Sequence, residues 1–160
     1  MDYKTADADE LKHKFWKAFA DSPFVFLERK NNPDGAVVMT AQLDKDANSA
    51  IWFFTKRDHH LAKMGPALCT FAGDDNQIFA RFDGTLSEES DKSRIDQFWN
   101  NIVEAWFEGK DDPNMILLRM DLGNAEIWNS DLGMISNAKM LLGMDVREES
   151  REKHVESTPL

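Results

Sequence analysis

The chain has few cysteines, few basic residues and no long apolar segment, and each shortage removes a class of protein. Cys69 is the only cysteine among 160 residues, which excludes an intrachain disulfide and a multi-cysteine metal site. Lysine and arginine number 19 against 29 acidic residues, so the formal net charge is −10. Proteins bind nucleic acids and anionic membrane surfaces through clustered lysine and arginine side chains, so neither is an expected partner of this acidic chain. No apolar run approaches the roughly 20 residues of a membrane-spanning helix.

The length and the hydrophobic content of the chain are typical of one soluble globular domain. Hydrophobic residues make up 42% of the chain, and a chain of this length can bury a substantial core. We expect a single domain over residues 1–144, followed by a charged tail over 145–160. The polar, acidic residues 1–10 resemble neither a signal peptide nor a transit peptide, so a cytoplasmic protein is the default expectation. Cys69 lies in an apolar segment and is expected to be a buried, inert thiol.

Residue periodicity predicts a mainly β fold with helical additions. Amphipathic spacing predicts helices over residues 5–21, 90–107 and 134–144, and a helical turn over 61–64. Apolar and β-branched segments bounded by turn residues predict strands over residues 24–29, 36–43, 50–55, 67–73, 77–88, 115–121 and 125–128. Six or seven closely spaced antiparallel strands favour a closed or partly closed β-barrel.

The segment from residue 36 to residue 63 carries the strongest chemical signal. It predicts two strands joined by a polar turn, followed by a basic corner and a short helical turn. Thr55 supplies a hydroxyl group there, and Lys56, Arg57 and Lys63 supply cations. Backbone N–H groups, a hydroxyl and cations gathered at one place form a binding site for a phosphate group. An acidic chain that binds phosphate must concentrate its few cations locally, and this corner does so.

Five short motifs follow one another between residues 8 and 142. They are Met39-Thr40-Ala41, Trp52-Phe53-Phe54-Thr55, Phe82-Asp83-Gly84-Thr85-Leu86, Ala105-Trp106-Phe107 with Asp111-Asp112-Pro113, and Ala125-Glu126-Ile127-Trp128. Their order and spacing resemble the FMN-binding split barrels related to pyridoxamine 5′-phosphate oxidase, most closely the general stress protein branch. The resemblance implies a split β-barrel homodimer that holds FMN in a groove between its subunits.

The resemblance also implies which residues would bind the flavin. The backbone of Met39 and Thr40 would pass the edge of the isoalloxazine ring. The ring and the phosphate would lie beside Phe54 and Thr55, and Trp128 matches a tryptophan that reaches the partner subunit's flavin in the oxidases. A flavin needs an apolar wall, backbone donors and fixed cations, and FAD or another flavin has similar needs. The remaining candidates are Phe53 in the aromatic run and Lys56, Arg57, His60 and Lys63 at the phosphate corner.

Three departures from the family pattern qualify this assignment. Val37 stands where relatives commonly have an arginine, and His60-Leu61 stand where they commonly have a lysine or arginine pair. Losing two cations weakens phosphate binding, because each charge-assisted bond contributes about 1.5–3 kcal/mol. Trp128 is followed by NSDLGMISNAK, which lacks the arginines and histidine with which the oxidases hold their vitamin phosphate. A true pyridoxamine phosphate oxidase is therefore not expected.

Two hypotheses follow from the sequence. The first is an FMN-binding general stress-type protein, with flavin-dependent oxidoreductase activity as one option and no catalytic side chain assigned. The alternative is a cofactor-free dimeric binding module that has lost the phosphate clamp, which Val37 and Leu61 favour. A metal site at His59-His60 is disfavoured, because adjacent histidines in a strand point to opposite faces. Trp99 and Trp106 are expected to be core or dimer contacts of the middle helix.

Overall fold

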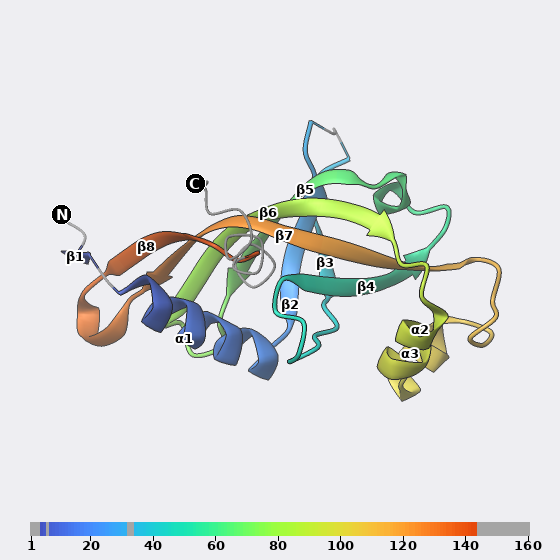
Figure 1. Ribbon diagram of the computed structural model, residues 1–160, viewed down its shortest axis with the longest axis horizontal. Coiled ribbons are helices and arrows are strands. Elements are labelled where there is room, and N and C mark those ends of the chain that lie inside the picture. Colours follow the sequence, from blue (N-terminus) through green and yellow to red (C-terminus); the bar gives the residue numbers. More distant parts are fainter. Residues whose placement is uncertain (1–3, 6, 32–33, 144–160) are drawn as a thin grey trace, which may run out of the picture.

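In the described residues, eight strands form one mainly antiparallel sheet that curls around an apolar core (Figure 1). The computed structural model describes residues 4–5, 7–31 and 34–143. The strands are β1 (Lys4–Thr5), β2 (Phe24–Arg29), β3 (Val37–Thr40), β4 (Ala50–Lys56), β5 (Gly65–Ala72), β6 (Ile78–Glu88), β7 (Met115–Asn129) and β8 (Ser136–Leu141). The helices are α1 (Ala8–Asp21), α2 (Lys92–Phe98) and α3 (Asn101–Trp106), with 3₁₀ turns η1 (His60–Lys63) and η2 (Asp131–Gly133).

The strand pairing confirms the predicted mainly β split-barrel fold. The order is β1-β8-β7-β6-β5-β2-β3, and β4 pairs with β7 outside this path. Strand β7 pairs with β6 along one edge, while its other edge is shared by β4 over residues 115–121 and β8 over residues 124–129. Among the described residues, only the two-residue β1 pairs in parallel, with β8. The sheet therefore divides where β7 passes from one partner to the other.

No ladder closes the barrel between β3 and β4 in the described residues. The two chain segments meet at one isolated bridge, in which Gln42 N donates to Trp52 O over 2.7 Å and Trp52 N donates to Gln42 O over 3.0 Å. Beyond this bridge the strands separate, and their facing edges stay open. The barrel is thus partly closed, one of the two forms that the sequence predicts.

Helix α1 covers one side of the core. Its first turn is capped by Asp7, whose Oδ1 accepts a hydrogen bond of 2.9 Å from Asp9 N. Leu11, Phe15 and Phe19 lie along one face at helical spacing and are fully buried. Ring contacts at 5.1–5.8 Å join the two phenylalanines to the sheet residues Phe71 and Phe82. No helix in the part of the chain that the structure describes is long and apolar enough to cross a membrane.

The predicted middle helix over residues 90–107 is wrong, because the chain forms two shorter helices. Trp99 has extended backbone angles and ends α2. The Asn100 side chain then accepts hydrogen bonds of 2.9 Å from Ile102 N and Val103 N, which caps a new helix, α3. Trp106 consequently lies 70% exposed, so it is not the core residue that a continuous helix predicts. Trp99 is half-buried, and its ring meets that of Phe54.

The C-terminal part of the sheet departs further from prediction. The segments 115–121 and 125–128 form the single strand β7, which continues through a bulge at Gly123-Asn124. Asp83 Oδ1 accepts a hydrogen bond of 2.8 Å from Asn124 N and so supports the bulge. The predicted helix over residues 134–144 is wrong: residues 136–141 form β8, because the edge of β7 offers backbone partners to a segment whose apolar pattern fits either period. The predicted tail, 145–160, lies outside the described residues.

Gly84 lets β6 approach β7 closely. A methyl group added at this Cα would overlap the carbonyl oxygen of Asp121 and meet the Met120 side chain. Because that oxygen is backbone in a paired strand, it cannot move aside without loss of pairing. We therefore expect Gly84→Ala to lower the free energy of unfolding by about 1–3 kcal/mol in urea denaturation. Thr85→Ala, an exposed neighbour on the same strand, is expected to change it by less than about 0.5 kcal/mol; equal effects would contradict the steric explanation.

Candidate functional site

The open split between β3 and β4 exposes unpaired strand edges. In a strand, the backbone groups of alternate residues face the same edge. Since Gln42 and Trp52 bond to each other across the split, the same alternation directs the backbone of Thr40 on β3, and of Phe54 and Lys56 on β4, toward it. In residues 34–143, no backbone hydrogen bond crosses the split beyond the Gln42–Trp52 bridge. The two edges therefore offer donors and acceptors to a flat ligand with a polar rim. The backbone of Met39 instead pairs with Val25 of β2.

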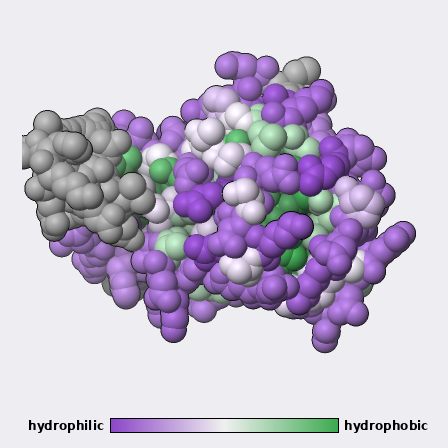
Figure 2. Space-filling model, turned by 45° about the vertical axis from the view of Figure 1, so that its right-hand side comes forward, coloured by the Kyte–Doolittle hydropathy of each residue, from purple (hydrophilic) through white to green (hydrophobic). Residues whose placement is uncertain are grey.

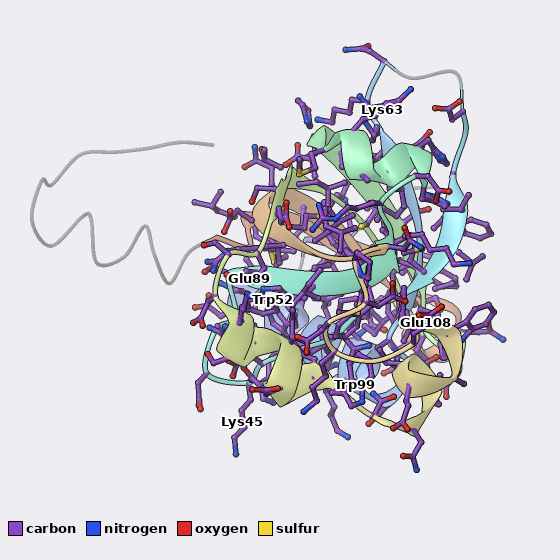
Figure 3. All side chains as sticks on the ribbon, turned by 90° about the vertical axis from the view of Figure 1, so that its right-hand side faces the viewer. Lys45, Trp52, Lys63, Glu89, Trp99 and Glu108 are labelled. Carbon is purple, nitrogen blue, oxygen red and sulfur yellow. The ribbon has the colours of Figure 1, made fainter. Side chains whose placement is uncertain are left out.

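The predicted aromatic wall is divided between the two faces of β4. Phe53 is 0% exposed and belongs to the core inside the barrel. Phe54 lies on the outer face, where its ring centroid is 6.2 Å from that of Trp99 and 6.4 Å from that of Phe107. Of the predicted pair, only the Phe54 side chain borders the outside of the split. Figure 3 looks onto this side of the molecule, with β4 between η1 above and the two short helices below.

The predicted basic corner lies where β4 ends. Thr55 is 8% exposed at the last inward-facing position of the strand, and η1 packs against the same strand. Lys56 and Lys63 are exposed, and Figure 3 shows Lys63 on η1 above β4. Leu61, by contrast, is 0% exposed and fills the core. The leucine at the position where relatives commonly carry a cation thus has a packing role in this chain.

Arg57 points away from the split. Its Nη2 lies 2.8 Å from Glu88 Oε2 at the end of β6, and its backbone N–H donates to Asn114 O over 2.7 Å. The side-chain hydrogen bond raises the pKa of Arg57 and lowers the pKa of Glu88, so both groups remain charged near neutral pH. This cation is therefore already neutralised by a partner from another strand.

Two buried nitrogen atoms near η1 have no hydrogen-bond partner among the described residues. One is His60 Nε2, and the other is Nη1 of Arg29, whose Nε donates to Met64 O over 2.9 Å. The rings of His59 and His60 stack at 4.3 Å, and His59 Nδ1 accepts from Leu61 N. Burial, and then the charge of His60, lowers the pKa of His59, which favours its neutral form. Sequence analysis missed Arg29, although its alternation with Val25 and Leu27 places it on the inward face of β2.

The histidine pair is not joined by a third potential metal ligand in the described residues. Within the residues that the structure describes, no three side chains of His, Cys, Asp or Glu gather in a way that could hold a metal ion. Cys69 is likewise unsuited to chemistry, since it is 0% exposed and burial raises the pKa of its thiol. The predicted burial of Cys69 is confirmed.

Trp128 lies far from the corner within one chain. It sits on the outer face near the end of β7, with the Arg81 guanidinium 5.6 Å from its ring centroid. Lys56 pairs with Met115 at the start of the same strand. Trp128 is thirteen positions beyond Met115 on β7 (128 − 115), which corresponds to about 40 Å along the strand at roughly 3.3 Å per residue. A single chain therefore does not bring Trp128 to the phosphate corner.

Comparison with known proteins identifies the family to which this split-barrel fold belongs. The family model described as "Pyridoxamine 5′-phosphate oxidase like" matches residues 10–151, and the chain belongs to this family. A general stress family protein from Xanthomonas campestris pv. campestris is 39% identical, covering 87% of this chain and 100% of that one, with a TM-score of 0.72. The general stress FMN/FAD binding protein from Xanthomonas citri is 38% identical over 85% and 100% of the two chains, with a TM-score of 0.71.

A curated relative points to the same branch over a short stretch. General stress protein 26 of Bacillus subtilis (strain 168) is 37% identical over 35 residues, which is 22% of this chain. The match spans a quarter of that protein's length. The predicted membership of the general stress branch is confirmed by these relatives together with the family match.

Proposed function

We propose that this chain binds FMN in the split between β3 and β4, as half of a homodimer. The observation that carries the proposal is the pair of open strand edges leading directly into a basic corner. The Xanthomonas citri relative, which is described as FMN/FAD binding, supports a flavin as the ligand. FAD or another flavin would make the same demands on the split and on the corner.

The residues present fit the parts of a flavin. Backbone groups of Thr40 and Phe54 would meet the polar edge of the ring, and the Phe54 side chain would supply an apolar wall. Lys56 and Lys63 would hold the phosphate as charge-assisted donors, with His60 beside them. A bound flavin would itself supply hydride or electron transfer. The activity would be that of a flavin-dependent oxidoreductase or a flavin carrier.

An exposed apolar patch supports the second copy in this proposal. Phe24, Phe26 and Val38 are 52%, 53% and 60% exposed on the outer face of β2 and β3. Phe26 pairs with Val38 in register, so these side chains adjoin one another around a shallow hollow of about 260 Å³. A contiguous apolar patch of this kind marks an interaction surface. Val38 also lies at the rim of the split. The resemblance to the oxidases implies that a two-fold partner would contribute its own Trp128 to this flavin.

A cofactor-free dimeric binding module remains the second candidate. Val37 and Leu61 occupy two of the positions where relatives commonly carry cations, and both pack against the core. The corner therefore has fewer cations than the family pattern provides. Under this alternative the dimer and its apolar patch are retained, and no flavin binds.

Titration with FMN and riboflavin tests the proposal. Because riboflavin lacks the phosphate, we expect FMN to bind the wild-type protein more tightly, and Lys63→Ala to weaken FMN binding about tenfold, or about 1.4 kcal/mol. Riboflavin binding should change little in the same variant. Arg57→Ala is the matched control: Glu88 already neutralises this arginine, so FMN affinity should stay within about twofold.

The outcomes separate the two candidates. Wild-type protein that binds neither compound, by flavin absorbance and fluorescence, would establish the cofactor-free module. Equal losses for FMN and riboflavin in Lys63→Ala would show that this lysine does not contact the phosphate. A large loss in Arg57→Ala alone would place the phosphate on the β6 side of the corner.

A further inference from the structure

A second hollow adjoins the corner on the other side of β4. Its volume is about 410 Å³, and its lining includes Lys56 at the end of β4 and Trp106 and Phe107 from the end of α3. Figure 2, in which the side of the molecule that carries α2 and α3 is turned forward, shows a mostly hydrophilic surface. Since Lys56 also borders the split, the hollow and the proposed flavin site share one wall.

Trp106 is the exposed aromatic side chain of this hollow. It is 70% exposed, although tryptophan normally buries most of its large ring. The fold makes no evident use of it, since the core contacts of α3 are made by Val103. The face of an indole ring attracts cations more strongly than any other side-chain ring, at about 0.5–1 kcal/mol when exposed and about 2 kcal/mol when desolvated.

The charges of the hollow also favour a cationic ligand. Three carboxylates, those of Asp58, Glu108 and Asp112, face one cation, Lys56, for a net charge of −2 (1 − 3). Asp112 accepts hydrogen bonds from Glu108 N and Asn114 N, which lower its pKa and keep it ionised. In the described part of the chain, Asp58 and Glu108 form no ion pair. If a flavin phosphate engages Lys56, the hollow becomes more negative still.

We propose that this hollow is a subsite for a planar organic cation, which stacks on Trp106 while the carboxylates neutralise its charge. Its position beside the flavin rests on the proposed function, because Lys56 would then join the two sites. The substrate class assigned to the flavin is accordingly a planar cation of the pyridinium or quinolinium kind. Anionic planar compounds would be repelled by the same carboxylates.

Equilibrium dialysis with two probes of similar size tests the subsite. The cation 1-methylquinolinium should bind at least tenfold more tightly than the anion naphthalene-1-sulfonate. Trp106→Ala should reduce cation binding about tenfold, and Glu108→Gln about threefold, with little effect on the anion. Ile102→Ala is the matched control, since Ile102 is 74% exposed on the same helix and outside the hollow, and binding should be unchanged. All three side-chain positions tested are exposed, so the variants should fold.

The experiment distinguishes failure of the subsite from failure of flavin binding. Equal affinity for the cation and the anion, or cation binding that survives Trp106→Ala, would overturn the subsite. Dialysis is run on the protein with and without FMN, and FMN binding is measured separately. A cation bound through Trp106 by a protein that does not take up FMN would support the subsite and overturn its placement beside a flavin. Cation affinity that rises when FMN is loaded would support both.

Discussion

Phe26→Glu is expected to convert the proposed homodimer into a monomer and to abolish FMN binding. Phe26 lies between Val38 of β3 and Thr70 of β5 in the strand register, at the centre of the exposed apolar patch. A carboxylate placed there would be buried without a partner when two copies meet, at a cost of several kcal/mol. Two-fold symmetry introduces this cost twice in each dimer. The monomer should fold normally, because residue 26 is 53% exposed and points away from the core.

Light scattering at micromolar concentration, followed by FMN titration, checks this prediction. Wild-type protein should have twice the mass of one chain, and Phe26→Glu the mass of one chain. Ile102→Glu places the same charge on an exposed apolar residue of α3 and should leave both mass and FMN affinity unchanged. A wild-type monomer would rule out the dimer and the shared site together. A Phe26→Glu dimer that had lost FMN would show that the patch contacts the ligand and not a second copy.

The parts of the fold that the sequence predicts are those decided locally. Helix α1 was predictable because its capping aspartate and its buried face lie within one short segment. Strand β8 was not, because the apolar residues of 136–141 fit both periods and the open edge of β7, distant in the sequence, selects the strand. The break between α2 and α3 depends on Asn100, whose role as a cap is apparent only once Trp99 is seen to be extended.

In the candidate site, too, features set by neighbouring residues were predictable and features set by distant residues were not. The corner at Thr55 to Lys63 is continuous in sequence, so its cations were predictable from their positions directly after a predicted strand. The partner of Arg57 was not predictable, since Glu88 lies 31 residues further along the chain. The opposite faces of Phe53 and Phe54 follow from strand alternation and could have been predicted. The exposure of Trp106 depends on a helix break that the periodicity concealed.

The second large effect is expected at Trp52, which holds the outer layer to the barrel. It is 0% exposed, and its Nε1 donates to Glu89 Oε1 over 2.8 Å. The guanidinium groups of Arg94 and Arg119 lie 4.6 Å and 5.5 Å from its ring centroid, and the ring of Phe98 lies at 5.1 Å. We expect Trp52→Ala to lower the free energy of unfolding by about 3–5 kcal/mol. Because a domain is stable by only about 5–15 kcal/mol, this variant would be marginally folded.

Trp52→Phe removes the hydrogen bond to Glu89 but keeps an aromatic ring in the core. The pH dependence of its stability then shows whether Glu89 is responsible for the loss. Burial raises the pKa of Glu89, but hydrogen bonds from Trp52 and Asp91 and the charges of Arg119 and Arg94 outweigh it and lower the pKa overall. A lowered pKa in the folded state stabilises the protein at pH values above the unfolded pKa of about 4.3, and this stabilisation disappears as pH falls through the folded pKa.

Without the indole N–H, we expect the free energy of unfolding to fall by about 1–3 kcal/mol at pH 7. In urea unfolding this difference should shrink toward pH 3. Trp16→Phe is the control, because the buried Nε1 of Trp16 has no hydrogen-bond partner in the part of the chain that the structure describes. The effect of this substitution should therefore not follow pH in this way. A Trp52→Phe loss that is equal at both pH values would assign the stabilisation to the size of the ring and not to the bond with Glu89.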